Sequence, residues 1–273
     1  MGISPLPEER VWTRPHAYPC LATAWDRLAA YLGDRFDPGL TNFEPLRRFL
    51  DQEWARLGTR FYESSLGYLY DLTFFHFMDA KDAFFQLVTG FAEANDITRI
   101  ADVGCGIALD AQALAQAGYD VDGYDLDNPS LAYARWRLDR DLPGGSHILP
   151  ITQLPDRRYQ LAYAVDVIGH ANDPLALIEL MLTTSEHVVI NLPPHDPRHR
   201  HGPADLHPSL DHTRILPIVQ EQAELITVAP SGEGVVTLWR STRSQPWTSW
   251  PRDLLGTART RPAGCLAGGA GNV

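Results

Sequence analysis

The residues with the clearest chemical potential follow a short apolar stretch near the middle of the chain. Gly104 and Gly106 stand one residue apart, between the apolar segment 99–104 and a helical pattern. A glycine turn of this kind lets backbone N–H groups approach a ligand and predicts a nucleotide site. Asp125 lies 19 residues beyond Gly106 (125 − 106), and Asp127 is a second candidate carboxylate. Asp125 is favoured for hydrogen bonds to ribose hydroxyls, because it directly follows the next predicted strand and neighbouring parallel strands end side by side.

Strand and helix patterns alternate around this turn. Apolar stretches predict buried strands at 99–104, 120–127, 147–151, 159–168 and 186–193, and amphipathic segments predict helices at 109–118, 129–142 and 173–183. This alternation is typical of a mostly parallel sheet with helices on both faces. Segments 223–229 and 234–240 are joined by only four residues, so they predict an antiparallel hairpin at the end of the sheet.

These motifs resemble the class I S-adenosylmethionine (SAM)-dependent methyltransferases over roughly residues 99–240. The resemblance rests on "DVGCGIALD", "GYDLD" and "AVDVIGHANDPLALI", together with the final hairpin. It implies an α/β fold with a Rossmann-like, mostly parallel seven-stranded sheet, and SAM as cosubstrate. Leu109 stands where the dinucleotide fingerprint has its third glycine, which together with the hairpin disfavours a dehydrogenase.

The resemblance also implies roles for individual residues around SAM. Asp102, Gly104 and Gly106 would shape the turn around its methionine part. Asp125 would hold the ribose and Leu126 would pack on the adenine. Asp166 and Val167 would lie near the amino acid portion and the reactive methyl group.

Histidines supply two candidate catalytic residues. Five of the chain's ten histidines stand in the connection after the fifth predicted strand: His195, His199, His201, His207 and His212. Their spacing does not match a helical HExxH metal site, so we expect a polar lid and no metal, with a metal cluster as the alternative. His212 precedes an apolar segment and is the candidate to face the pocket as a base. The second is His170, although the histidine at this place in the resembling family is often structural.

The N-terminal region is predicted to be a helical cap rich in aromatic residues. Helices are expected at 21–32 and 42–57, and residues 54–91 hold 11 of the chain's 27 aromatic residues. Most of these residues are expected to pack in a core. Because an aromatic face stabilises a sulfonium by cation–π attraction, Tyr62 and Tyr68 are candidate cofactor contacts and Tyr70 is a candidate catalytic residue.

The chain is expected to have three parts: a helical cap over 1–95, a SAM-binding Rossmann-like domain over 96–241 and an irregular, flexible tail over 242–273.

Composition limits the partners and the location of the protein. The net charge of −11 gives no electrostatic footprint for nucleic acid or an anionic membrane. No stretch resembles a membrane span or a signal peptide. We therefore expect a cytoplasmic monomer or homodimer that acts on a small molecule.

The leading functional hypothesis is methyl transfer from SAM to an O or N atom of a small-molecule acceptor in specialised metabolism. One alternative on the same fold is a SAM cyclase, lyase or aminocarboxypropyl-transfer enzyme, for example one that forms azetidine-2-carboxylate and releases methylthioadenosine. A second is a non-catalytic SAM-binding protein, which the intact glycine turn and Asp125 disfavour. The sequence leaves the acceptor unnamed.

Overall fold

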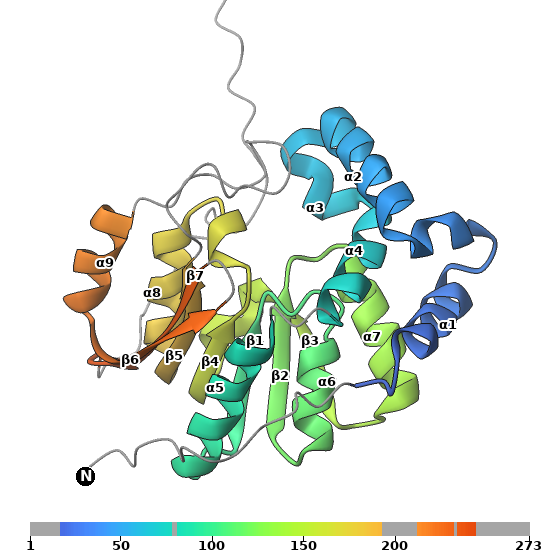
Figure 1. Cartoon of the computed structure of the whole chain (residues 1–273). Coiled ribbons are helices and arrows are strands. Elements are labelled where there is room, and N and C mark those ends of the chain that lie inside the picture. Colours follow the sequence, from blue (N-terminus) through green and yellow to red (C-terminus); the bar gives the residue numbers. More distant parts are fainter. Residues whose placement is uncertain (1–16, 78–80, 193–211, 232–233, 244–273) are drawn as a thin grey trace, which may run out of the picture.

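The computed structural model describes residues 17–77, 81–192, 212–231 and 234–243. Its centre is a seven-stranded sheet in the order β3-β2-β1-β4-β5-β7-β6 (Figure 1). The strands are β1 (Arg99–Val103), β2 (Asp120–Asp125), β3 (Ser146–Pro150), β4 (Tyr159–Ala164), β5 (Ser185–Leu192), β6 (Ala223–Ser231) and β7 (Gly234–Ser241). The first five strands pair in parallel, whereas β7 pairs antiparallel with both β5 and β6. The predicted mostly parallel sheet with a terminal antiparallel hairpin is therefore confirmed.

Helices cover both faces of the sheet because consecutive strand residues point to opposite sides. Ile100 packs in a core with α5 (Asp82–Ala94), α6 (Leu109–Gln116) and α7 (Pro129–Asp141). Its neighbour Ala101 packs in a second core with α8 (Pro174–Thr184), α9 (His212–Gln220) and the 3₁₀ segment η5 (Ile151–Asp156). The predicted boundary at residue 95 groups α5 with the cap, but α5 packs on the sheet.

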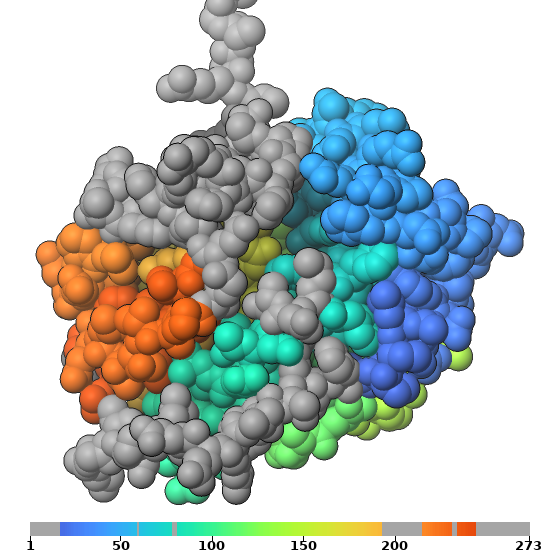
Figure 2. Space-filling view, viewed as in Figure 1, coloured from blue at the N-terminus to red at the C-terminus, as the bar shows by residue number. Residues whose placement is uncertain are grey.

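The N-terminal helices form a separate layer beside α7, shown in blue to cyan in Figures 1 and 2. They are α1 (Leu21–Leu32), α2 (Phe43–Leu57), α3 (Phe61–Ser64) and α4 (Gly67–His76), with the 3₁₀ segments η1 (Gly33–Arg35), η2 (Pro38–Thr41) and η3 (Gly58–Arg60). A third core joins α1, α2 and α4 to Tyr133 on α7 and to Ile107 and Leu109 after the glycine turn. We refer to residues 17–77 as the cap.

One side chain links the cap to the start of α7. The Asn128 side chain accepts a hydrogen bond from Leu131 N at 2.9 Å, which caps the helix, and its amide donates to the Tyr62 carbonyl at 3.0 Å. Figure 1 shows α3 and α4 above the ends of the central strands where this helix begins. The cap is thus held over the carboxyl ends of the sheet.

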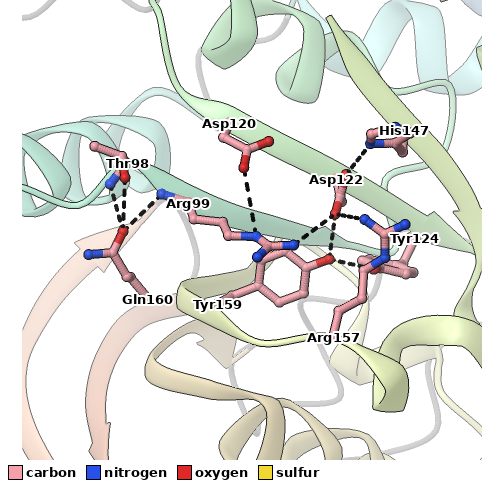
Figure 3. A network of polar contacts seen from close by, with 9 residues as sticks. All are labelled: Thr98, Arg99, Asp120, Asp122, Tyr124, His147, Arg157, Tyr159 and Gln160. Atoms are coloured by element: carbon pink, nitrogen blue, oxygen red, sulfur yellow. Dashed lines mark hydrogen bonds and ion pairs between the residues drawn. The ribbon is translucent and has the colours of Figure 1, made fainter. Parts of the chain in front are cut away.

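A polar network lies at the opposite end of the parallel strands, near the amino ends of β1 and β4 (Figure 3). The Asp122 side chain is 2% exposed and accepts hydrogen bonds from Tyr159 Oη at 2.7 Å and Arg157 Nη1 at 2.8 Å. His147 Nδ1 lies 2.9 Å from its other oxygen, and Arg99 Nη2 lies 4.0 Å away. This buried carboxylate is therefore surrounded by donors and cations.

Within the described ranges, no helix is both long and apolar enough to cross a membrane.

Candidate active site

The glycine turn between β1 and α6 has a backbone that only glycine adopts readily. Gly104 has a φ of +74°, and a Cβ there would lie 2.2 Å from Val167 Cγ2. Gly106 has a φ of +55°, and a Cβ there would lie 3.1 Å from Leu72 Cδ1 on α4. Close approach as well as φ thus requires glycine at position 104, whereas φ is the main reason at position 106. The contact with Leu72 also places the cap directly against the turn.

Asp125 ends β2 beside this turn. Its carboxylate accepts hydrogen bonds from Gly106 N and Leu126 N, each at 2.6 Å. Burial raises the pKa of Asp125 to about 6, although these two bonds act to lower it. Leu126 is half-buried and packs against the core on the α8 side. The structure therefore brings Asp125 and Leu126 next to the turn, as the motif spacing predicts.

Asp102 lies two residues before Gly104, near the carboxyl end of β1. It is 4% exposed, and burial, followed by the negative charge of Asp110, raises its pKa to about 8. Asp110 is the second residue of α6 and lies 2.9 Å from Lys81 Nζ and 3.2 Å from His76 Nδ1. The site thus contains a buried carboxyl group, Asp102, that carries a proton at neutral pH.

The segment after β4 contributes a second group of polar residues. Asp166 has a φ of +55°, and its backbone N donates to the Asn191 side-chain oxygen at 2.7 Å. Asp166 Oδ1 lies 3.8 Å from His170 Nε2, and the other ring nitrogen, His170 Nδ1, lies 2.8 Å from Tyr62 Oη. The sequence candidates Tyr62, Asp166 and His170 are therefore in one chain of contacts, which joins the cap to the strand ends.

The rings of Tyr62 and Tyr68 pack against each other beside these polar contacts. Their rings are 5.1 Å apart between centroids in an edge-to-face arrangement, and the Tyr62 and His170 rings are 5.4 Å apart. Burial raises the pKa of both tyrosines, and the charges of Asp71 and Asp166 raise them further. The hydroxyls therefore stay neutral and face a negatively charged environment.

Asp71 is a functional candidate that the sequence reasoning did not select. It is half-buried on α4, and no hydrogen bond or ion pair joins it to the described part of the chain. Burial, then the charge of Asp166, raises its pKa to about 6, while His170 acts to lower it. The signal available in the sequence was the acidic residue between Tyr70 and Leu72 in an otherwise apolar helix.

One predicted catalytic residue, Tyr70, lies apart from this group. Tyr70 is 2% exposed in the core of the cap, stacks on Phe36 and accepts a hydrogen bond from Asp37 N at 2.8 Å. Since these contacts occupy both its ring and its hydroxyl, we do not retain a catalytic role for it. His212 is the first residue of α9, and the other four histidines of its segment lie outside the described residues. Among the described residues, no group of three His, Cys, Asp or Glu side chains could hold a metal ion.

Comparisons with known proteins point to one enzyme class. Two relatives named ubiquinone biosynthesis O-methyltransferase match short stretches: 32% identity over 84 residues in Bordetella avium and 31% over 83 residues in Hydrogenovibrio crunogenus. Each stretch is 29% of this chain and about a third of the relative (35% and 34%). The chain thus spans only a minor part of the length of these relatives.

Solved structures of methyltransferases are also similar. Magnesium protoporphyrin IX methyltransferase from Synechocystis PCC 6803 with bound SAM matches at 17% identity and a TM-score of 0.46, over 72% of this chain and 95% of that one. The family described as "Methyltransferase domain" matches residues 46–221, which is more than half of the chain. The chain therefore belongs to the methyltransferase domain family.

Proposed function

We propose that this protein transfers a methyl group from SAM to a nucleophilic atom of a small molecule, in a pocket between the glycine turn and the cap. The observation that carries the proposal is the meeting of two sets of residues at the carboxyl ends of β1, β2 and β4. One set is the turn with Asp125; the other is the polar chain of Tyr62, His170 and Asp166. In open α/β sheets, ligands bind outside these strand ends.

The turn side would hold SAM. Asp125 would accept hydrogen bonds from the ribose hydroxyls, and Leu126 would pack on the adenine. The methionine part would extend past Gly104 toward Asp166, and the sulfonium would lie near the faces of Tyr62 and Tyr68. An aromatic face over a desolvated cation is worth about 0.5–2 kcal/mol.

The cap side would hold the acceptor. Methyl transfer forms a bond from the acceptor to the methyl carbon and breaks the carbon–sulfur bond, whose electron pair stays on sulfur as SAM becomes S-adenosylhomocysteine (SAH). Alignment supplies much of the rate, and a base is needed where the acceptor arrives protonated. Asp71, with a pKa raised to about 6 by burial, and the Tyr62–His170 pair are the bases that this geometry offers.

The charges of the site favour an amine acceptor. Asp71 and Asp166 are two carboxylates beside two neutral tyrosines, an arrangement suited to a cationic ammonium group that then gives its proton to a carboxylate. The printed names of the curated relatives favour an O acceptor instead, through stretches that cover about a third of their length. We propose the amine class and keep the O acceptor as its competitor. A pathway of specialised metabolism is part of the same proposal.

The same observation supports a second candidate, SAM cyclisation. Here the α-amino group of SAM itself, after losing a proton to one of these bases, bonds to its own γ-carbon. The bond from that carbon to sulfur breaks, and methylthioadenosine leaves beside azetidine-2-carboxylate. The chemical demand on the site is identical, namely a base for an ammonium group near the sulfonium. The two candidates differ only in which molecule carries the amine.

Incubation with SAM, followed by mass analysis, separates the candidates. The first arm contains SAM alone, and the second adds a panel of primary amines, secondary amines and phenols. SAH formed only with an amine supports the proposal, and SAH formed only with phenols replaces the amine by an oxygen acceptor. Methylthioadenosine without added acceptor supports cyclisation. No turnover and no SAH binding by calorimetry would exclude both enzymatic candidates.

A matched pair of variants tests the base. Asp71→Asn removes the carboxylate without changing its shape, and Asp26→Asn, on α1, is the control. We expect Asp71→Asn to lower kcat by about tenfold to a hundredfold, the scale of one proton-transfer group, and to remove a pH limb near 6. Turnover with an unchanged pH profile in Asp71→Asn would assign the proton to the Tyr62–His170 pair.

A further inference from the structure

Arg137 is a fully buried cation beside the glycine turn. It lies on α7 with 0% exposure, and its Nη2 and Nε both point to the carbonyl oxygen of Ile107, at 2.7 and 3.3 Å. Ile107 stands between two residues with left-handed backbone, Gly106 at a φ of +55° and Ala108 at +57°. The guanidinium therefore holds a peptide carbonyl between the two left-handed positions of the turn.

The remaining donors of Arg137 reach α6 and the N-terminal segment. Nη1 donates to the Gln112 side-chain oxygen and to Tyr18 Oη at 3.4 Å, and the guanidinium lies 5.5 Å from the centre of the Tyr18 ring. Tyr18 in turn donates its hydroxyl to Asp141, which also forms an ion pair with Arg27 Nη2 at 2.5 Å. A continuous polar chain thus joins the cap's first residues to the glycine turn.

Packing alone does not explain a charge at this place. No carboxylate of the described residues forms an ion pair with Arg137, whose partners are a carbonyl, an amide, a phenol hydroxyl and a phenol ring. Removing a cation from water against neutral partners costs several kcal/mol, and an apolar side chain of similar volume is often at least as stabilising. The function of the charge lies instead in what it orients.

We propose that Arg137 is a positioning residue for SAM, which fixes the Ile107 carbonyl and thereby the shape of the glycine turn, and that Tyr18 holds Arg137 in place. Tyr18 and Arg27 lie before residue 46, where the family match begins, so this support comes from a segment of the chain outside the family's common part. The inference rests on the proposed place of SAM at the turn. It assigns to the N-terminal segment an influence on cofactor affinity without any contact with the cofactor.

Arg137→Met tests the proposal, because methionine keeps the length and removes the charge. Arg140→Met is the matched control, since Arg140 is exposed on the same helix and lies over the Trp136 ring. We expect SAH affinity to fall about tenfold or more in Arg137→Met, the scale of a hydrogen bond to a charged group, and to stay within about twofold in Arg140→Met. Unchanged SAH affinity in folded Arg137→Met would overturn the proposal.

Tyr18→Phe decides the case in which Arg137→Met does not fold. It keeps the ring over the guanidinium and removes only the hydroxyl. We expect about a threefold loss of SAH affinity with a melting temperature close to that of the wild type. Wild-type affinity in Tyr18→Phe would remove the N-terminal segment from the proposal.

Hydrogen exchange in the ligand-free protein separates this inference from the proposed function. Exchange of the Gly106 and Ala108 amides should be about tenfold faster in the folded Arg137 variant, with the β5 and β7 amides unchanged. Faster exchange in the Arg137 variant, together with a wild type that binds no SAH, would sustain the role in shaping the turn while the proposed function fails. Unchanged exchange at both amides would refute that role.

Discussion

Buried carboxylates have opposite surroundings at the two ends of the parallel sheet. Near the amino ends, Asp122 faces Arg157, Tyr159, His147 and Arg99, all within 4.0 Å (Figure 3). At the carboxyl ends, Asp71, Asp102 and Asp125 form no ion pair with any lysine or arginine in the part of the chain that the structure describes, and burial raises the pKa of each. The first carboxylate is fully compensated within the protein, whereas the other three are not.

We propose that this difference separates a structural group from functional ones. A buried charge with a complete set of partners holds the strands together, and removal of one partner leaves the others unpaired. Carboxyl groups that are buried without cations reduce the stability of the protein when they are ionised, and groups with such raised pKa values cluster at functional sites. SAM carries a sulfonium and an ammonium group, and its ribose supplies hydroxyl donors. The carboxyl ends of the strands are therefore suited to a cationic nucleoside, and the amino ends are not.

The largest expected effect comes from Gly104→Val at the functional end. The new side chain would overlap Val167 at a φ of +74°, so we expect a loss of SAH affinity of at least about a hundredfold. Calorimetry with SAH measures it. Gly118→Ala is the control, because Gly118 has a φ of +98° but open space around it. Tight SAH binding by the folded Gly104 variant would place the cofactor elsewhere.

At the compensated end, Asp122→Ala should lower the free energy of unfolding by about 1–3 kcal/mol, because it leaves the buried hydroxyl of Tyr159 without its acceptor. Chemical denaturation measures this change. Its control, Asp120→Ala, removes an exposed carboxylate 3.7 Å from Arg99 and should cost less than about 1 kcal/mol. SAH affinity should be unchanged in both variants. A loss of affinity in Asp122→Ala without loss of stability would reverse the comparison.

Asp125→Ala should weaken SAH binding by about 1.5–3 kcal/mol, the scale of hydrogen bonds to a charged group, and should not lower the stability of the ligand-free protein by as much. Asp127→Ala is the control, since its exposed side chain lies 3.7 Å from Arg135. Calorimetry and thermal melts on the same samples measure both quantities. Equal SAH affinity in the two variants would remove Asp125 from the ribose site.

The smallest expected effect is a gain in stability that depends on pH. The folded pKa of Asp102 is raised from 3.8 to about 8, so the folded state retains a proton that the unfolded state loses between about pH 4 and pH 8. The contribution of Asp102 to stability therefore falls as pH rises through that window. Asp102→Asn should raise the free energy of unfolding by about 1–2 kcal/mol at pH 8.5 and by much less at pH 4. If the free energies of unfolding of variant and wild type differ by the same amount at every pH from about 4 to 8.5, this account is contradicted.

Much of the fold follows from local sequence patterns. The helix predicted at 21–32 is α1, and the predicted hairpin 223–229 and 234–240 is β6 and β7 with ends extended by one or two residues. These segments have an apolar period that identifies them without knowledge of the rest of the chain. The glycine turn and Asp125 were found for the same reason, because the residue types and their spacing along the chain define the motif.

Residues whose roles depend on tertiary contacts were not found in this way. Tyr68 and Tyr70 stand in the same short motif, yet residues two apart on a helix point to different sides, so Tyr68 faces the site and Tyr70 the core of the cap. Asp71 and Arg137 gain their importance from burial beside residues far away in the chain. The grouping of α5 with the cap followed from its aromatic content, which does not tell a sheet-covering helix from a cap helix.

The link made by Asn128 has a kinetic consequence. The Asn128 side chain both caps α7 and donates to the Tyr62 carbonyl. It therefore fixes the part of the cap above the proposed methyl-transfer site to the domain that would bind the adenosine. The Leu72 side chain, which lies against Gly106, holds the same part of the cap on the glycine turn. We therefore expect the first turnover to be fast and later ones to be paced by the departure of SAH, as in enzymes whose lids open more slowly than their chemistry proceeds.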